Sequence, residues 1–362
     1  GHDVTVYEKL SRVGGRNSAL KLGDFTFELG PTFVMLPDVF KEVFELAGKN
    51  VNDYLDMRLL ELMYSLHYAD GRNFKIYFDK EKIKQEIQRL FPEDVVGYDN
   101  FLKKHEKKFI TTYACLTIPY HRWWHYFRLK LLRAVFYMQN HLSVHGVLKK
   151  YFKNEDMRIA MAFQAKYLGM SAWQCPGAFS ILSYVEHAFG VWHPLGGVHK
   201  ISEAMAKVAQ ENGAKIILNT KVSKVNVENK KITSVTLNDG SVVEADEFIM
   251  NEDFAYGMTE LIEEKYRPSY SDSKLENSKY SCSTFMIYLG LKKIYDLPHH
   301  NIFFSTEYKK NVDQIFISKE LPQDPSFYIH NPVVTDKSLA PAGKSAVYVL
   351  VPISNLSAKI DW

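Results

Sequence analysis

The chain has 362 residues, and its 45 lysines and arginines against 42 aspartates and glutamates leave a net charge of +3 with histidine neutral. Hydrophobic residues make up 46% and charged residues 24%, which is ample apolar material for a folded core. These figures exclude wholesale disorder, a collagen-like chain and a disulfide-rich miniprotein. The length indicates two or three structural units, or one large interleaved fold. The near-neutral charge does not favour nucleic-acid binding.

An apolar run rich in β-branched residues, Val4–Tyr7, ends in Glu8. The second strand of a nucleotide-binding βαβ unit ends in this way, with its carboxylate accepting hydrogen bonds from ribose hydroxyls. On this interpretation the first strand, the G-x-G-x-x-G turn and the first helix are expected upstream of Gly1. An edge strand followed by a solvated glutamate is the alternative.

The segment Arg12–Arg16 places Gly14 and Gly15 between two cations. Glycine lets the backbone approach a ligand, and a guanidinium can pair with a phosphate through two hydrogen bonds, although a surface turn has the same composition. A short alternating strand, Phe25–Leu29, then leads into Gly30-Pro31-Thr32. Together the three elements favour a nucleotide-binding segment more than any one of them does.

Local patterns of apolar, capping and turn residues predict the remaining helices and strands. One of them, a hairpin over Ile232–Val243, is expected to return to the nucleotide-binding sheet. In chain order they are strands within Met57–Phe78 around the turn Asp70-Gly71, a helix from the cap Asp79 to Leu90, a helix opening at Pro92-Glu93-Asp94, a helix over Ile201–Val208 stopped by Gly213, a strand at Lys215–Val222, a hairpin over Ile232–Val243 around Asn238-Asp239-Gly240, and strands at Ala245–Met250, Thr284–Leu291, Asn301–Ser305, Phe327–His330 and Ala346–Pro352.

From Lys107 to Asn154 the chain carries nine lysines and arginines and no acidic residue, and Tyr120–Arg128 mixes these cations with aromatic side chains. Three interpretations stay open: a platform for single-stranded nucleic acid, a surface that lies on a membrane, and a core helix with a basic exposed face. The uncharged run Tyr167–Val185 contains glycine, serine and proline, so we expect a buried wall there and not a membrane-spanning helix.

Three cysteines, Cys115, Cys175 and Cys282, form no C-x-x-C pair, which predicts neither a disulfide framework nor a zinc site and favours a reducing compartment. Several histidines are candidates for one of two roles. They are either structural hydrogen-bonding residues or, where two of them stand at helical i, i+4 spacing, metal ligands. No metal site is expected, because no carboxylate or cysteine stands near the paired histidines. These histidines are His121 and His125, His141 and His145, His193, and His299 and His300.

Longer segments resemble those of the phytoene desaturase family, the bacterial-type FAD-dependent carotenoid desaturases of the flavin amine oxidase superfamily. The resemblance covers nearly the whole chain. Besides the N-terminal elements above, its segments are Asp70-Gly71, Gly190–Gly197, His299–Phe304, Asp324–Tyr328, Asn331-Pro332, Thr335-Asp336 and Ser338–Pro341.

The resemblance implies an α/β (α+β) enzyme of two lobes, a Rossmann-like FAD-binding lobe built from discontinuous segments and a membrane-attached substrate lobe with a mixed sheet and helices. Residues 1–56 and 191–256 would form the FAD-binding lobe. Residues 57–190 would form the substrate and membrane-associating lobe, and residues 257–362 its sheet. The family's C-terminal flavin-contacting segment is expected beyond Trp362.

The family's cofactor contacts carry over to eight residues of this chain. Glu8 would hold the adenosine ribose; Gly14, Gly15 and Arg16 would line the pyrophosphate; Gly30, Pro31 and Thr32 would approach the isoalloxazine; and Val222 would contact adenine through its backbone.

The implied reaction is desaturation of phytoene, in which a CH2–CH2 unit gives a hydride to flavin N5 while a neighbouring proton leaves. We expect a lipophilic polyene substrate, a cytoplasmic and peripherally membrane-associated protein, and oxygen or a quinone as electron acceptor. The docking surface would include Trp123, Trp124, Arg128 and Arg133. No catalytic acid or base is identified.

Alternatives within the same fold are a C30 carotenoid desaturase, a carotenoid oxidase, a carotene isomerase and a retinol saturase. An amine oxidase and a non-catalytic membrane-binding module represent other classes of function.

Overall fold

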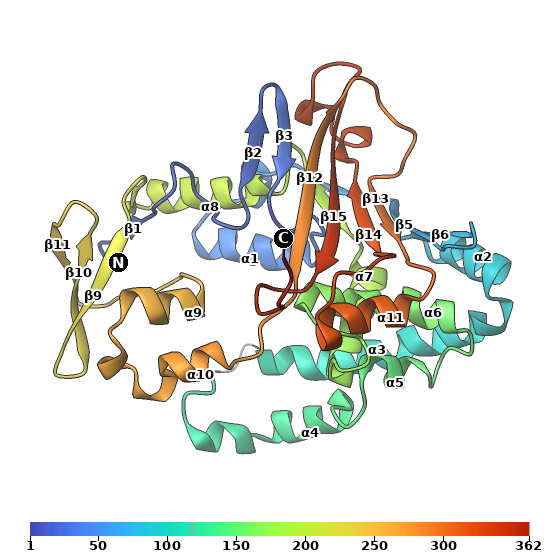
Figure 1. The fold of residues 1–362 in the computed structure, drawn as a ribbon, viewed down its shortest axis with the longest axis horizontal. Coiled ribbons are helices and arrows are strands. Elements are labelled where there is room, and N and C mark those ends of the chain that lie inside the picture. The colour runs from blue at the N-terminus through green and yellow to red at the C-terminus, as the bar shows by residue number, and fades with distance from the viewer. Residues whose placement is uncertain (117–118, 362) are drawn as a thin grey trace.

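A computed structural model describes residues 1–116 and 119–361 (Figure 1). The structure is α/β: one large mixed sheet stands at its centre, with small sheets on one side and a group of helices below it. The strands β9–β11 lie at the left edge of this view, and β6 with α2 lies at the right edge.

The central sheet has six strands in the order β12-β15-β14-β13-β5-β6. Only the β13–β5 pair is parallel, so the sheet is mixed as the resemblance implies. The predicted turn at Asp70-Gly71 joins β5 to β6, and Gly71 has the positive φ of 88° that favours glycine there. The strands are β5 Leu62–His67, β6 Asn73–Tyr77, β12 Ser283–Leu291, β13 His300–Phe303, β14 Phe327–His330 and β15 Ser345–Ile353.

The smaller sheets hold the N-terminal and middle parts of the chain. β1 pairs in parallel with β8, while the pairs β2–β3 and β4–β7 and the three strands β9–β11 are antiparallel. Their bounds are β1 Thr5–Tyr7, β2 Ala19–Leu22, β3 Phe25–Glu28, β4 Met57–Leu59, β7 Trp192–Pro194, β8 Lys215–Ile217, β9 Val222–Glu228, β10 Lys231–Leu237 and β11 Val242–Glu244.

Two predictions in this region are wrong. The hairpin β10–β11 pairs with β9 in a sheet of its own and does not return to the β1–β8 sheet. The apolar run Ala245–Met250 forms no strand; no neighbouring strand pairs with it, and Ile249 is 96% exposed. Apolar composition alone does not make a strand when the backbone finds no partner.

The helices begin and end largely where capping residues predict. Asp79 accepts hydrogen bonds from the backbone N–H groups of Glu81 and Lys82 and so caps α2, and Gly213, with φ of 94°, follows α8. The helices are α1 Pro37–Leu46, α2 Lys80–Leu90, α3 Val95–Leu116, α4 Leu129–Met138, α5 Val144–Leu148, α6 Glu155–Ala160, α7 Ile181–Phe189, α8 His199–Glu211, α9 Phe254–Tyr256, α10 Asp272–Glu276 and α11 Tyr308–Asp313.

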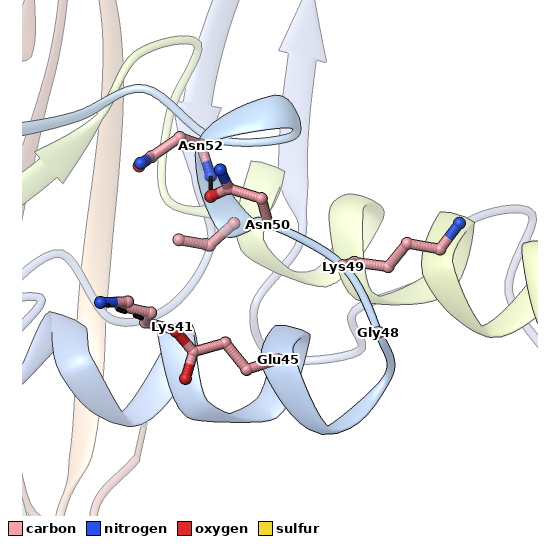
Figure 2. A pocket seen from close by; sticks show the side chains of 7 residues that line it. Lys41, Glu45, Gly48, Lys49, Asn50 and Asn52 are labelled. Carbon is pink, nitrogen blue, oxygen red and sulfur yellow. Dashed lines mark hydrogen bonds and ion pairs between the residues drawn. The ribbon is translucent and has the colours of Figure 1, made fainter.

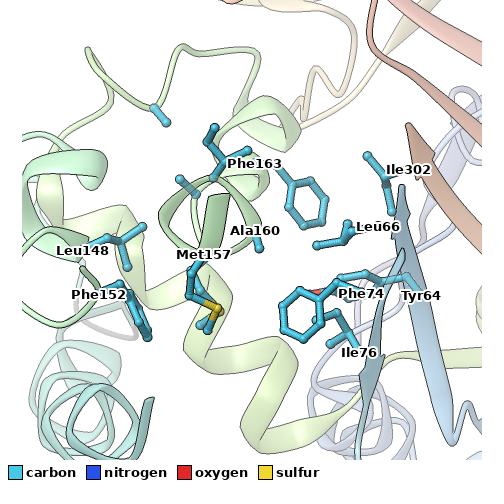
Figure 3. Packing of buried hydrophobic residues seen from close by; sticks show 14 of the residues in the cluster. Tyr64, Leu66, Phe74, Ile76, Leu148, Phe152, Met157, Ala160, Phe163 and Ile302 are labelled. Atoms are coloured by element: carbon cyan, nitrogen blue, oxygen red, sulfur yellow. The ribbon is translucent and has the colours of Figure 1, made fainter. Parts of the chain in front are cut away.

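The main hydrophobic core lies between β5, β6 and β13 of the central sheet and the helices that cover them (Figure 3). Aromatic side chains such as Tyr64, Phe74 and Phe163 fill it. The run Tyr167–Val185 reaches this core, but not as one helix: it contains the end of one short helical turn, a second turn, Gly177–Ser180, and the start of α7. Within the described residues no helix has the length and apolarity to cross a membrane.

Candidate functional site

Two parts of the predicted nucleotide site, Glu8 and the chain leading to Val222, lie together where β1 ends. The Glu8 backbone N–H donates to the Ile217 carbonyl oxygen at 2.9 Å, and the Thr220 N–H donates to the Glu8 carbonyl oxygen at 2.9 Å. These bonds bring the chain leading to Val222 beside Glu8. The Glu8 carboxylate itself accepts a bond from the Leu10 N–H at 2.8 Å and leaves its second oxygen uncommitted.

The glycine segment forms a tight turn close to this strand end. Gly14 has φ of 103°, and its carbonyl oxygen accepts a hydrogen bond from the Asn17 N–H at 2.8 Å. Gly15 has φ of 52° and no heavy atom within 4 Å of the position a Cβ would take. The Arg16 guanidinium pairs with Asp253 at 2.7 Å while 86% of its side chain stays exposed. The turn therefore presents open backbone and a partly free cation, which suits a phosphate group.

Gly30 joins this turn to the central sheet. A Cβ on Gly30 would collide with the Arg16 carbonyl oxygen, so only glycine permits the close approach of the two segments. Two residues later, the Thr32 hydroxyl lies 3.0 Å from the Tyr328 hydroxyl and accepts a hydrogen bond from the Tyr348 hydroxyl at 3.4 Å. The predicted pyrophosphate and isoalloxazine segments are thus continuous in space.

Two buried carboxylates that the sequence analysis did not identify hold the turn before α8. Glu28 accepts hydrogen bonds from the Val198 and His199 N–H groups at 2.8 and 3.2 Å, and Asp336 accepts one from the Gly196 N–H at 2.6 Å. A negative charge beside the start of a helix is favourable because the N–H groups there have no partner within the helix. These bonds tie β3 and the segment after β14 to the same turn.

Four buried histidines, His193, His299, His300 and His330, gather beside Thr32 and Tyr328. Nε2 of His299 lies 3.1 Å from Nε2 of His330, and Nδ1 of His300 lies 2.6 Å from the Tyr328 hydroxyl. Burial lowers the pKa values of the last three well below the usual range, so these rings are neutral near pH 7. Hydrogen bonds hold at least one nitrogen of each of the four rings, while Nδ1 of His193 and Nε2 of His300 are buried without a partner among the described residues.

The prediction that these other histidines form pairs on a helix is wrong, because His121 and His141 lie outside helices. His145 lies on α5, and its ring pairs with the Glu155 carboxylate at 2.8 Å. In the part of the chain that the structure describes, the histidines close enough to share a cation are His299, His300 and His330, whose ligand atoms lie within 4.8 Å of one another.

Aromatic rings connect Thr32 to the main core through its neighbour, Phe33. The Phe33 ring stacks on His300 with 4.2 Å between centroids and tilts against Tyr64 and Tyr167 at 5.7 and 5.4 Å. Behind these two tyrosines lies Glu186, a fully buried carboxylate on α7. The sequence offered one signal for it, a lone acidic residue directly after the uncharged run Tyr167–Val185.

The predicted docking residues lie elsewhere: Trp123 and Trp124 on the short helical turn Trp123–Phe127, Arg128 directly after it, and Arg133 on α4. Trp123, Trp124, Arg128 and Arg133 are all exposed, which contradicts a core position for this segment. α4 runs along the lower edge of the molecule in Figure 1.

A surface pocket beside the C-terminal end of α1 touches none of the predicted site residues (Figure 2). Lys41 and Glu45 form an ion pair at 3.6 Å on one side of it, and Asn50 accepts a hydrogen bond from the Asn52 N–H on the other. These polar groups are already paired with one another, so we assign no role to this pocket.

Comparison with known proteins identifies relatives over the whole chain. The family described as flavin containing amine oxidoreductase matches residues 1–255. A 4,4'-diapophytoene desaturase (4,4'-diapolycopene-forming) from Methylomonas sp is 43% identical over all of this chain and 71% of its own length. A zeta-carotene-forming phytoene desaturase from Myxococcus xanthus is 34% identical over all of this chain and 70% of its own. An oxidoreductase from Methanosarcina mazei shares the fold, with a TM-score of 0.61, 18% identity, and coverage of 99% of this chain and 75% of that one.

Asp336 provides a stability test of this site. Burial raises its pKa, but hydrogen bonds from His193, Ser338 and Gly196 outweigh burial and lower it to about 2. A lowered carboxyl pKa stabilises the fold above the unfolded value of about 4, and this contribution is lost as the pH falls from about 4 towards 2. Asp336→Asn should therefore lower the free energy of unfolding by about 1–3 kcal/mol at pH 7 and by less at pH 3, measured by urea unfolding. The exposed control Asp246→Asn should change the free energy of unfolding by under about 0.5 kcal/mol at both pH values. An equal loss for D336N at pH 7 and pH 3 would contradict the conclusion that the ionised Asp336 carboxylate stabilises the fold.

Proposed function

Because this chain belongs to the flavin-containing amine oxidoreductase family, we propose that the protein is an FAD-dependent carotenoid desaturase whose substrate is an acyclic precursor such as 4,4'-diapophytoene or phytoene. The observation that carries this proposal is the similarity to two desaturases over the entire chain. The chain is an oxidoreductase with FAD as its cofactor.

The residues at the end of β1 fit such a cofactor. The free oxygen of Glu8 can accept a ribose hydroxyl, the open backbone at Gly15 and the exposed face of Arg16 can take the pyrophosphate, and the chain before Val222 passes beside Glu8 so that its backbone can reach the adenine. Gly30, Pro31 and Thr32 then lead towards the central sheet, where the isoalloxazine would lie. FAD supplies the hydride acceptor; the protein supplies its orientation and an apolar surrounding.

We further propose the division into lobes that the family implies. Residues 1–56 and 191–256 contain α8 and the strands of the small sheets except β4, which comes from residues 57–190 and pairs with β7, and would bind FAD. Residues 57–190 and 257–362 contribute the strands of the central sheet and the helices beneath it and would bind the substrate.

Substitution at Glu8 tests the cofactor site. Glu8→Gln removes the charge that strengthens a hydrogen bond to the ribose, which is worth about 1.5–3 kcal/mol, so FAD should bind about ten- to a hundredfold more weakly. The measurement is FAD affinity of the full-length apoprotein, followed by flavin fluorescence. Glu42→Gln, an exposed substitution on α1, is the control and should bind FAD as the wild type does. Equal affinity of E8Q and the wild type would contradict the assignment of Glu8.

Pigment analysis tests the reaction. The full-length protein, expressed in cells that accumulate diapophytoene and in cells that accumulate phytoene, should yield carotenoids with longer-wavelength, finely structured absorbance in at least one of them. The 43% match makes diapophytoene the first substrate to test. Unchanged precursors of both kinds, in cells whose protein purifies with FAD, would reject the proposal.

A surface on α4 and its preceding turn supports docking to a membrane. Its exposed side chains are apolar and aromatic, with cations among them, and Trp123 and Phe136 are 72% and 86% exposed. Aromatic residues prefer the headgroup level and cations prefer anionic lipid, which makes this combination typical of a protein that lies on a bilayer. The exposed apolar members are Trp123, Trp124, Tyr126, Phe127, Leu129, Leu132, Val135, Phe136 and Tyr137.

Replacing Trp123, Trp124, Arg128 and Arg133 together by alanine should weaken binding of the full-length protein to anionic vesicles. The two arginines alone account for about 2 kcal/mol, so the affinity should fall about thirtyfold or more. Co-sedimentation measures this. The double variant Lys41→Ala with Leu46→Ala, on the exposed side of α1, is the control. Undiminished co-sedimentation of the fourfold variant would exclude this surface as the membrane-docking surface. An equal loss in the control would show that the protein binds vesicles without a specific docking surface.

A further inference from the structure

Glu186 is a carboxylate enclosed in the main core, within the proposed substrate lobe. Its Oε2 accepts hydrogen bonds from the Tyr64 hydroxyl at 2.9 Å and from Nε2 of Gln164 at 2.7 Å. Its Oε1 is buried and accepts none. Across residues 1–116 and 119–361 no lysine, arginine or histidine forms an ion pair with it. A buried carboxyl with one oxygen unused is unfavourable, which calls for a functional explanation.

The partners of Glu186 are held in orientation. The Ser183 hydroxyl donates to the Met161 carbonyl oxygen at 2.5 Å and lies 3.1 Å from Oε1 of Gln164, while Nε2 of Gln164 donates to Glu186. Both hydrogen bonds to the carboxyl reach Oε2, which leaves Oε1 to gain or lose a proton.

Tyr167 connects this carboxyl to accessible space. Its ring packs between Phe33 and Phe163, yet 41% of its surface is exposed. Phe33 packs against both Tyr167 and Tyr64, and the Tyr64 hydroxyl donates to Glu186, so Tyr167 and the carboxyl belong to one aromatic cluster. Phe33 in turn follows Thr32, where the proposed isoalloxazine segment ends.

We propose that Glu186 accepts the proton that leaves the substrate during desaturation, and that the Tyr167 hydroxyl relays it. This inference rests on the proposed function. Forming one C=C bond breaks two C–H bonds on adjacent carbons: one hydrogen would leave as a hydride, for which bound FAD would be the acceptor, and the second would leave as a proton. As the Tyr167 oxygen takes that proton it passes its own to Glu186, so Tyr167 ends unchanged and Glu186 ends protonated.

The pKa of Glu186 itself fits this role. Burial raises the pKa of Glu186, hydrogen bonds from Gln164 and Tyr64 lower it in part, and the result is about 7. Such a carboxyl is ionised often enough near neutral pH to act as a base.

The other groups around α7 titrate elsewhere. Burial raises the pKa of Tyr64 well above its usual range and lowers that of His187, which lies 2.9 Å from the Tyr98 hydroxyl, to about 4. Two lysines with pKa values lowered by burial to about 8, Lys108 and Lys166, contact Ser180 and the Tyr308 ring.

Anaerobic single-turnover reduction of the flavin by substrate in vesicles, with the full-length enzyme, tests the proposal across pH. The wild-type rate should rise with pH and level off above about 7. Glu186→Gln keeps the size and the hydrogen-bonding partners but removes the base, so it should slow reduction by about a hundredfold or more and abolish this pH dependence. Tyr167→Phe should slow it likewise, while Glu186→Asp should retain part of the rate and the pH dependence. Glu42→Gln should behave as the wild type.

A second measurement needs no turnover. The apoprotein should show an infrared carboxylic-acid band that disappears around pH 7 and is missing in E186Q. Wild-type turnover with unchanged rate and pH profile in E186Q would overturn the role of Glu186, as would a larger loss in E186D than in E186Q, which is the pattern of a packing role. No turnover by the wild type with either substrate would instead refute the proposed function, and the infrared titration would still report whether Glu186 carries the exchangeable proton.

Discussion

Two buried carboxylates on one short turn are the constraint on which the arrangement of the molecule depends. Glu28, at the end of β3, and Asp336, after β14, both accept backbone N–H groups between Gly196 and His199. A Cβ at Gly197, which has φ of 104°, would collide with the Glu28 carboxylate, so the turn requires glycine there. The three segments lie far apart in the sequence, and these bonds fix the start of α8 against the central sheet.

This fixed turn also explains why the site is continuous. β3 leads directly into Gly30, whose backbone lies against the carbonyl group of Arg16, and then into Thr32 and Phe33. The polar end of the site, beside Glu8, is therefore connected by one stretch of backbone to the aromatic end, beside Tyr328. A flavin enzyme with an apolar substrate needs this combination, because its cofactor has a charged half and a reacting half.

Much of the fold could be predicted from the sequence, since it depends on neighbours in the chain. The cap at Asp79, the turn at Gly71 and the apolar runs that become β12 and β15 are set by local chemistry. The run Ala245–Met250 shows the limit of such reasoning. It has the composition of a strand, but a strand exists only if another strand supplies its hydrogen-bond partners, and that depends on the whole chain.

For the candidate site, the sequence by itself determined the residue types at the cofactor end: an acidic residue after a strand, a glycine turn with a cation, and a cationic aromatic surface elsewhere. Only the tertiary structure decided that Glu28, Asp336 and Glu186 are buried, because the burial of a carboxylate depends on which distant segments enclose it. Glu186 is accordingly a lone acidic residue in the sequence and a group with a pKa of about 7 in the fold.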